Sequence, residues 1–142
     1  MNLSHAPLRL ATGAFILNAG LGKRGLPDDA AAGLQGMATN GVPALGKLSP
    51  RAFGQTISTG EIALGAALLA PFVPSTVAGA GLAAFGGGLV QMYLNTPGMT
   101  QDGSRVRPSQ DGTAIAKDIW LVGAGLTLLV SGLASRKSAD RA

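Results

Sequence analysis

The sequence contains no cysteine, a single histidine and few charged residues. Without cysteine the chain cannot form disulfides, use a thiolate nucleophile or bind zinc or iron–sulfur clusters through sulfur. The one histidine, His5, lies in the N-terminal tail, so a histidine-built metal or haem site is not expected. We therefore expect no metal and no intrinsic cofactor.

Charge is scarce across the whole chain. Charged residues make up 13% of the 142 residues and hydrophobic residues 46%, whereas soluble domains carry about 25% charged residues. The 22 glycines suit close helix packing in a membrane. The net charge of +4 comes from basic residues without interleaved aromatics, which favours lipid headgroups over nucleic acid as the partner.

A long apolar stretch separates Glu61 from Asp102 without any charged residue. A single helix of about 40 residues would be about 60 Å long, roughly twice the hydrocarbon thickness of a bilayer. The chain must therefore fold back once, and "PFVP" at Pro71–Pro74 supplies the break. This predicts two antiparallel membrane helices, over about residues 53–73 and 74–95.

Two more apolar segments flank this pair. One spans about residues 114–135, and the other covers about residues 7–23, where the side chains of Arg9 and Lys23 can reach outward to the membrane surface. A cleaved signal peptide is the alternative for the N-terminal segment, but a small-x-small cleavage site is missing before Lys23 and Arg24.

The sequence thus predicts an all-α fold. We expect one integral membrane four-helix bundle over residues 1–142, with a soluble helical bundle as the alternative. Both long loops, about residues 25–52 and 96–113, should lie on one side, together with the interfacial aromatics Tyr93 and Trp120.

The first loop contains a further helix signal. Asp28 and Asp29 suit a helix N-terminus, and Asn40-Gly41 is a common helix stop. We expect a short helix that lies on the bilayer surface or caps the bundle. Its apolar face is predicted to consist of Leu26, Ala30, Leu34 and Met37.

Glu61 is the most unusual residue of the predicted spans. It lies about 12 Å into the second span, where a carboxylate costs about 2.5 to 3.5 kcal/mol unless it faces a polar group. Gly54, Ser58, Glu61 and Gly65 form a small and polar stripe, which we expect to face inward. We expect Lys117 to supply the counter-charge and Asp118 to meet Lys23, Arg24 or a loop arginine.

The predicted polar cluster has two interpretations. It can be a buried ion-pair network that fixes helix register, or a proton-active or quinone-headgroup site. The cluster comprises Glu61, Lys117, Asp118, Lys23, Asn18, Gln91 and Arg9.

Four segments, in this order, resemble the DoxX-like family of small four-helix bacterial membrane proteins. They are "RLATGAFILNAGLGK", "NGVPALGKL", "GEIALGAALL" and "AKDIWLVGAGLTLL", and the resemblance covers about residues 8–134. It implies a bundle in the bacterial cytoplasmic membrane and redox partners, since relatives include a membrane subunit of a thiosulfate:quinone oxidoreductase. The matching polar positions are Arg9, Lys23, Glu61, Lys117 and Asp118.

Three functions are compatible with these features. The first is an accessory or anchor subunit of a membrane redox assembly, with quinone as a candidate ligand and other redox proteins or a second copy of the chain as candidate partners. The second is a small proton-coupled transporter, and the third a purely structural subunit of a membrane complex. A free-standing enzyme is least expected, because the sequence has no nucleophile–base pair, metal cluster or phosphate loop.

Overall fold

The computed structural model describes residues 3–139, with side chains up to Ser135, and this part of the chain is all-helical. Residues 1–2 and 140–142 of the expected domain lie outside it. The helices, in chain order, are η1 (Leu3–His5), α1 (Ala6–Gly22), α2 (Asp28–Gly41), η2 (Pro43–Lys47), α3 (Pro50–Leu69), α4 (Ser75–Asn95), α5 (Thr113–Ala116) and α6 (Ile119–Ala139). The described residues form no strand beyond one isolated bridge in the loop before α5.

Local sequence signals set the helix ends. The Ser49 side chain accepts a hydrogen bond from the Ala52 amide and caps α3, with Pro50 in the first helical position. α3 ends at Leu69, and α4 begins at Ser75 directly after Pro74, so the expected break at "PFVP" is confirmed. The expected helix in the first loop is also present as α2, with Asp28 and Asp29 in its first turn.

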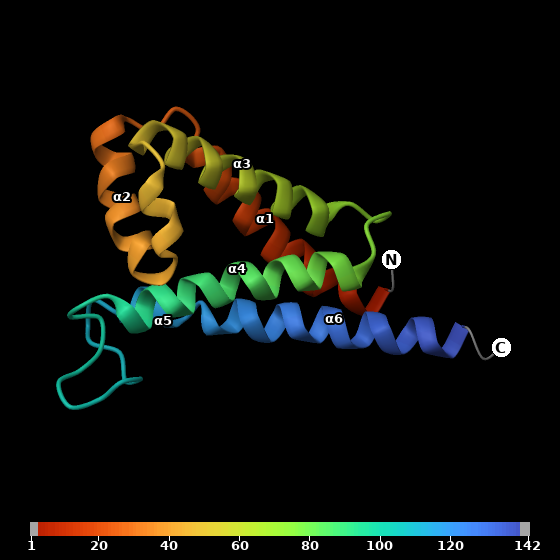
Figure 1. Ribbon diagram of the computed structural model, residues 1–142. Helices are drawn as coiled ribbons and strands as arrows, with labels where there is room; N and C mark the ends of the chain where they lie inside the picture. Colours follow the sequence, from red (N-terminus) through yellow and green to blue (C-terminus); the bar gives the residue numbers. More distant parts are fainter. Residues whose placement is uncertain (1–2, 140–142) are drawn as a thin grey trace.

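The long helices form two antiparallel pairs, α1 with α3 and α4 with α6 (Figure 1). The pairs meet at the α3–α4 turn and diverge toward the opposite end, where α2 packs against both α3 and α4. The direct contact of α3 with α4 is much smaller than the contact within either pair. The structure is therefore two helix pairs joined by a turn at one end and by α2 at the other.

Glycines allow the helices of each pair to approach closely. A Cβ atom added to Gly65 would lie 2.5 Å from the Leu17 amide nitrogen, and one added to Gly79 would lie 2.6 Å from that of Leu129. Neither position has room for any side chain. Close backbone contact at small residues is typical of helix association in membranes.

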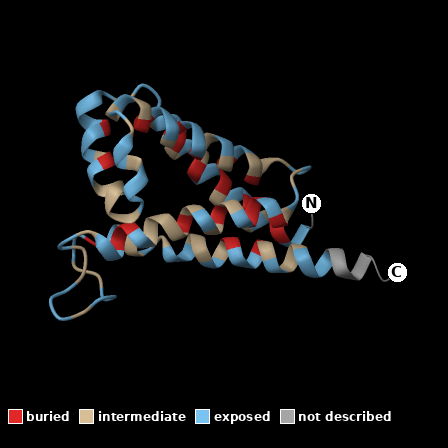
Figure 2. Ribbon diagram, in the orientation of Figure 1, coloured by how far each residue is buried: buried red, intermediate tan, exposed pale blue. Residues whose placement is uncertain are grey.

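The buried residues lie mainly on the facing sides of the helices (Figure 2), and many of them are apolar. The central cluster takes Ile16 from α1, Leu68 from α3, Ala78 and Leu82 from α4, and Leu128 from α6. This small core connects both pairs. Most of the remaining α6 surface is exposed or half-buried, although it is apolar.

Two helical segments are long and apolar enough to cross a membrane, namely α4 and residues Thr113–Ser135. With 21 residues, α4 is about 31 Å long, which matches the hydrocarbon thickness. Only 33% of the residues in the most apolar stretch of α4 are buried in the protein. In the corresponding stretch of Thr113–Ser135 only 11% are buried. α1, with 17 residues, and α3, which contains Arg51 and Glu61, are not among these two segments.

The last predicted span differs from a continuous helix over residues 114–135. α5 ends at Ala116, and α6 begins at Ile119. At this junction the Trp120 amide donates to the Lys117 carbonyl and the Leu121 amide donates to the Asp118 carbonyl, each at 3.0 Å. Each bond joins residues three apart in the sequence, as in a 3₁₀-helix. The Asp118 carboxylate thus stands at the start of α6, where the helix dipole favours negative charge.

The inward face of α2 also differs from the prediction. Its buried residues are Ala31 and Gln35, whereas Ala30 is exposed. The Gln35 amide donates to the Leu45 carbonyl at 2.7 Å and to the Leu48 carbonyl at 2.9 Å. These bonds hold η2 and the following Leu48 against α2, so the buried face of α2 combines the polar Gln35 with the apolar Ala31.

Candidate functional site

An ion pair between Lys23 and Glu61 links α1 to α3. The Lys23 Nζ donates to Glu61 Oε2 at 2.8 Å and to Oε1 at 3.0 Å, and it also contacts the Ala19 carbonyl at 3.4 Å. The Glu61 side chain is 8% exposed and that of Lys23 is 25% exposed. Both carboxylate oxygens are therefore occupied, and the three donors of the ammonium group each have an acceptor.

The antiparallel packing of α1 on α3 brings this pair together. Gly20 lies against α3, where an added Cβ would stand 2.8 Å from the Ile62 amide nitrogen. The Ser58 hydroxyl donates to the Gly20 carbonyl at 2.8 Å. The stripe of Gly54, Ser58, Glu61 and Gly65 is buried along its whole length, which confirms its predicted inward orientation.

The counter-charge of Glu61 is Lys23, and the expectation that Lys117 would fill this role is wrong. Lys117 is exposed and lies with Tyr93 and Trp120 around a separate apolar cavity of about 540 Å³. The physical reason is the pairing of the helices. α3, which carries Glu61, packs on α1, whereas α5 and α6, which flank Lys117, pack on α4. Asp118 is half-buried and forms no ion pair within the described residues.

The two amides of the predicted cluster do not join it. Asn18 in α1 and Gln91 in α4 are both exposed. Neither side chain forms a hydrogen bond with another described residue, and the partner of Glu61 is Lys23. The expectation that Asn18 and Gln91 join a shared polar cluster with Glu61 is therefore wrong.

Arg9 belongs to the opposite end of α1. Arg9 and Lys23 are fourteen positions apart in the sequence, which corresponds to roughly 21 Å of helix. Its side chain is completely buried. The guanidinium donates to the carbonyls of Leu68 at 2.8 Å, Ala67 at 2.9 Å, Ala70 at 2.8 Å and Val73 at 2.9 Å, and to the Ser75 hydroxyl at 3.2 Å.

These five bonds explain how a charge is tolerated there. A guanidinium has five N–H donors, and every one of them finds an oxygen. Most of the oxygens are carbonyls at the C-terminus of α3, which lack helical partners and carry partial negative charge. His5 Nδ1 lies 2.9 Å from the same Ser75 hydroxyl. Sequence reasoning missed this cap because nothing local to Arg9 indicates which helix end it faces.

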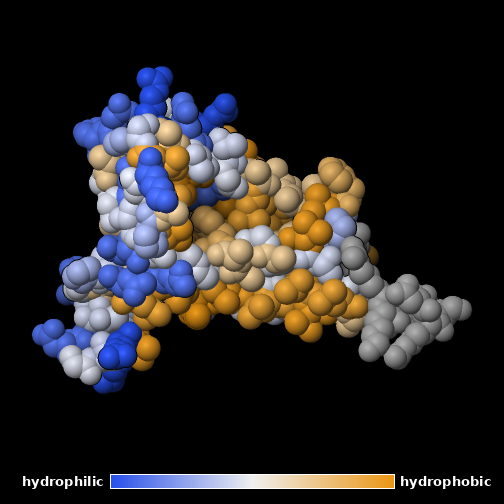
Figure 3. Space-filling model, in the orientation of Figure 1, coloured by the Kyte–Doolittle hydropathy of each residue, from blue (hydrophilic) through white to orange (hydrophobic). Residues whose placement is uncertain are grey.

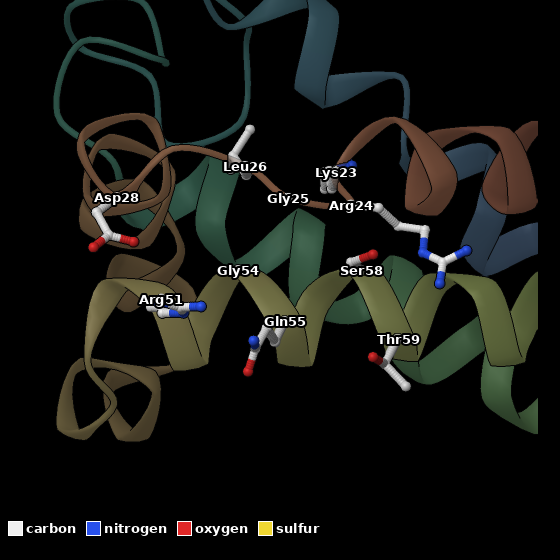
Figure 4. A pocket seen from close by; sticks show the side chains of 10 residues that line it. All are labelled: Lys23, Arg24, Gly25, Leu26, Asp28, Arg51, Gly54, Gln55, Ser58 and Thr59. Atoms are coloured by element: carbon white, nitrogen blue, oxygen red, sulfur yellow. The ribbon is translucent and has the colours of Figure 1, made fainter.

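A polar cavity of about 430 Å³ is lined in part by Lys23, the partner of Glu61 (Figure 4). Its walls are the loop after α1, the first turn of α2 and the first half of α3, and Arg24 extends over α3 toward Ser58 and Thr59. The lining residues are Lys23, Arg24, Gly25, Leu26, Asp28, Arg51, Gly54, Gln55, Ser58 and Thr59. We call this cavity the polar pocket.

The polar pocket offers charge recognition and hydrogen bonding. It combines cationic side chains with the carboxylate of Asp28, the amide of Gln55 and the hydroxyl of Thr59. Among the described residues no group of three histidine, cysteine, aspartate or glutamate side chains could hold a metal ion. Such a lining can accommodate a polar or anionic group.

Comparisons of the chain with protein-family models, with curated proteins and with solved structures found no match. The DoxX-like resemblance thus stays a prediction that rests on the four quoted sequence segments and their order.

Proposed function

We propose that this protein is a multi-pass protein of the bacterial cytoplasmic membrane that acts as an accessory or anchor subunit of a membrane redox assembly. The observation that carries the proposal is the separation of polar and apolar surface (Figure 3). Hydrophilic side chains gather at the end with α2 and the loop over residues 96–112, and hydrophobic ones cover α4 and α6. This pattern matches a bilayer-embedded body with one polar cap.

The exposed face of α6 supports this placement. Ile119, Leu126, Val130 and Leu133 follow one another at helical spacing and are 48% to 63% exposed. A continuous apolar face of this length is unfavourable in water and favourable against lipid or another membrane helix. It gives an anchor subunit a surface on which a partner helix can pack.

The ion pair supports an accessory role over proton-coupled transport. Glu61 is held by Lys23 through both oxygens, and a carboxylate that exchanges protons with a substrate path would have to leave this partner. A bidentate ion pair between two helices suits the fixing of α1 against α3. The redox partners and quinone of the proposal come from the DoxX-like resemblance at Arg9, Lys23, Glu61, Lys117 and Asp118.

Single-cysteine labelling tests the four-span topology. Because the natural chain has no cysteine, each introduced cysteine is the only site for a membrane-impermeant thiol reagent. We expect Gly36→Cys in α2 and Ser104→Cys in the long loop to label from the same side, and Phe72→Cys in the α3–α4 turn from the opposite side. Labelling of Gly36→Cys together with Phe72→Cys would leave only α4 and α6 as spans and contradict the proposal.

Native mass spectrometry of the protein extracted gently from its host membrane tests the anchor role. We expect stoichiometric recovery of an oxidoreductase chain, with or without a bound quinone. Recovery of the chain alone or as a homodimer, together with proton-coupled uptake in vesicles that Glu61→Gln abolishes, would instead assign the protein to transport.

A further inference from the structure

Two arginines of the polar pocket form no ion pair with any side chain that the structure describes. Arg24 lies two residues after the end of α1, and Arg51 lies in the first turn of α3. Within the described residues neither guanidinium forms an ion pair or a side-chain hydrogen bond. Lys23, the third cation of the lining, is neutralised by Glu61. The lining therefore contains two guanidinium groups that have no ion-pair partner among the described residues, with Arg24 over α3 near Ser58 and Thr59 and Arg51 at the opposite end of the cavity (Figure 4).

We propose that the polar pocket binds a phosphate group that carries a hydroxylated head, as in phosphoglycerol. The planar fork of a guanidinium matches the oxygen geometry of phosphate and can form two parallel hydrogen bonds with it. Arg24 and Arg51 supply such forks, and the Asp28 carboxylate of the same lining accepts hydrogen bonds from head hydroxyls. The cavity volume of about 430 Å³ lies within the range of small-ligand sites.

The position of the pocket suggests where the phosphate comes from. Arg24 lies two residues after the end of α1, and Arg51 lies in the first turn of α3, so both lie where the two helices meet the α2 end of the molecule (Figure 4). If the protein spans the membrane as proposed above, this end of the two helices coincides with the phosphates of the lipids. Soluble glycerol phosphate has the same chemistry and is the second source.

Lipid retention in nanodiscs tests the lipid source. The protein is placed in phosphatidylcholine nanodiscs with or without phosphatidylglycerol, and co-purifying lipid is counted by native mass spectrometry. We expect roughly tenfold preferential retention of phosphatidylglycerol, since charge-assisted hydrogen bonds to phosphate are strong and the choline ammonium is repelled by the arginines. Arg24→Gln and Arg51→Gln should each reduce this preference severalfold.

A matched control separates the pocket from general charge. Arg105→Gln removes the same charge from an exposed arginine of the 96–112 loop, which is not part of the lining, and should leave the preference unchanged. Gln55→Trp keeps both arginines and fills the cavity from α3, so it should also abolish the preference. Equal losses in Arg105→Gln and the pocket variants, or full retention in Gln55→Trp, would overturn the proposal.

Titration with glycerol 3-phosphate in detergent distinguishes a soluble phosphate ligand from a lipid headgroup. It also tests the phosphate site independently of the proposed membrane function. Binding that requires Arg24 and Arg51, without retention of phosphatidylglycerol, would support the phosphate site and assign it a soluble ligand. If the labelling experiment contradicts the membrane topology, this titration still shows whether the polar pocket binds phosphate. Absence of both lipid retention and glycerol 3-phosphate binding would exclude the site.

Discussion

The two ends of the α1–α3 pair handle positive charge in different ways. At one end Arg9 is completely buried and donates only to backbone carbonyls and one hydroxyl. At the other end Lys23 is partly exposed, pairs with Glu61 and borders the polar pocket. The first arrangement closes a turn, whereas the second stands beside open space that a ligand can enter.

This difference separates architecture from function. Every donor of Arg9 is used inside the protein, so nothing remains for a ligand, and its loss should affect stability alone. Lys23 holds the start of the first loop, and the next residue, Arg24, is left free to face the cavity. We therefore expect substitutions at the Arg9 end to unfold the protein and substitutions at the pocket end to change binding.

Arg9→Met should have the largest effect on stability. It removes a donor from four carbonyls, of which that of Ala70 keeps the Val73 amide, and each of the other three unsatisfied buried groups costs about 1 to 3 kcal/mol. We expect the free energy of unfolding to fall by more than about 3 kcal/mol, as measured by denaturant unfolding in detergent micelles. Arg9→Lys keeps the charge but has fewer donors, and should lie between the wild type and Arg9→Met.

A loss below about 1 kcal/mol in Arg9→Met would mean that water replaces the guanidinium. The two ends of the α1–α3 pair would then differ only in how exposed their cationic side chains are, and not in how much those side chains stabilise the fold.

The fold was predictable from the sequence where its signals are local. Proline breaks and apolar run lengths placed α4 within a residue of its observed bounds and indicated α2 through Asp28, Asp29 and Asn40-Gly41. The pairing of helices was not predictable in this way. It depends on which glycine surfaces fit each other, as Gly65 fits Leu17 and Gly79 fits Leu129, and such complementarity exists only in three dimensions.

Gly79→Ala should have the second largest effect, because it forces α4 away from α6. The new methyl group would stand 2.6 Å from the Leu129 amide nitrogen, and overpacking of this kind costs about 1 to 3 kcal/mol. Gly87→Ala is the matched control on the same helix, since an added Cβ there meets nothing within 4 Å. It should be neutral or stabilise the helix by up to about 1 kcal/mol.

Thermal unfolding of both variants in the same detergent checks this prediction. Equal destabilisation would show that loss of helix flexibility, and not contact with α6, is the cause.

The same limit explains the errors at the candidate site. Glu61 and its inward stripe were predictable, because a carboxylate in an apolar span must face polar groups. The partner was not, since Lys23 and Lys117 both lie near the polar end and only the pairing of α1 with α3 selects between them. The polar pocket arises from a loop, α2 and α3 together, and no segment alone indicates it.

The Lys23–Glu61 pair should contribute a moderate coupling energy. We expect a double-mutant cycle of Lys23→Gln and Glu61→Gln to give about 0.6 to 1.7 kcal/mol, the range of polar pairs in membrane proteins. The cycle is measured by unfolding in detergent micelles. In the parallel cycle of Lys117→Gln with Glu61→Gln the coupling should be close to zero, because Lys117 is exposed at the separate cavity. Coupling to Lys117 instead of Lys23 would contradict the observed pairing.

Tyr93→Phe should have the smallest effect on stability and a local one. The Tyr93 hydroxyl donates to the Val106 carbonyl at 3.0 Å and ties the loop over residues 96–112 to α4. Its removal should cost about 1 kcal/mol and speed trypsin cleavage after Arg105, whereas Arg107 is protected by the following Pro108. Thr12→Val deletes a hydroxyl bond within α1 and should leave cleavage unchanged. Faster cleavage in both variants would mean that each substitution destabilises the whole protein. It would contradict a local effect of the Tyr93 hydrogen bond on the loop over residues 96–112.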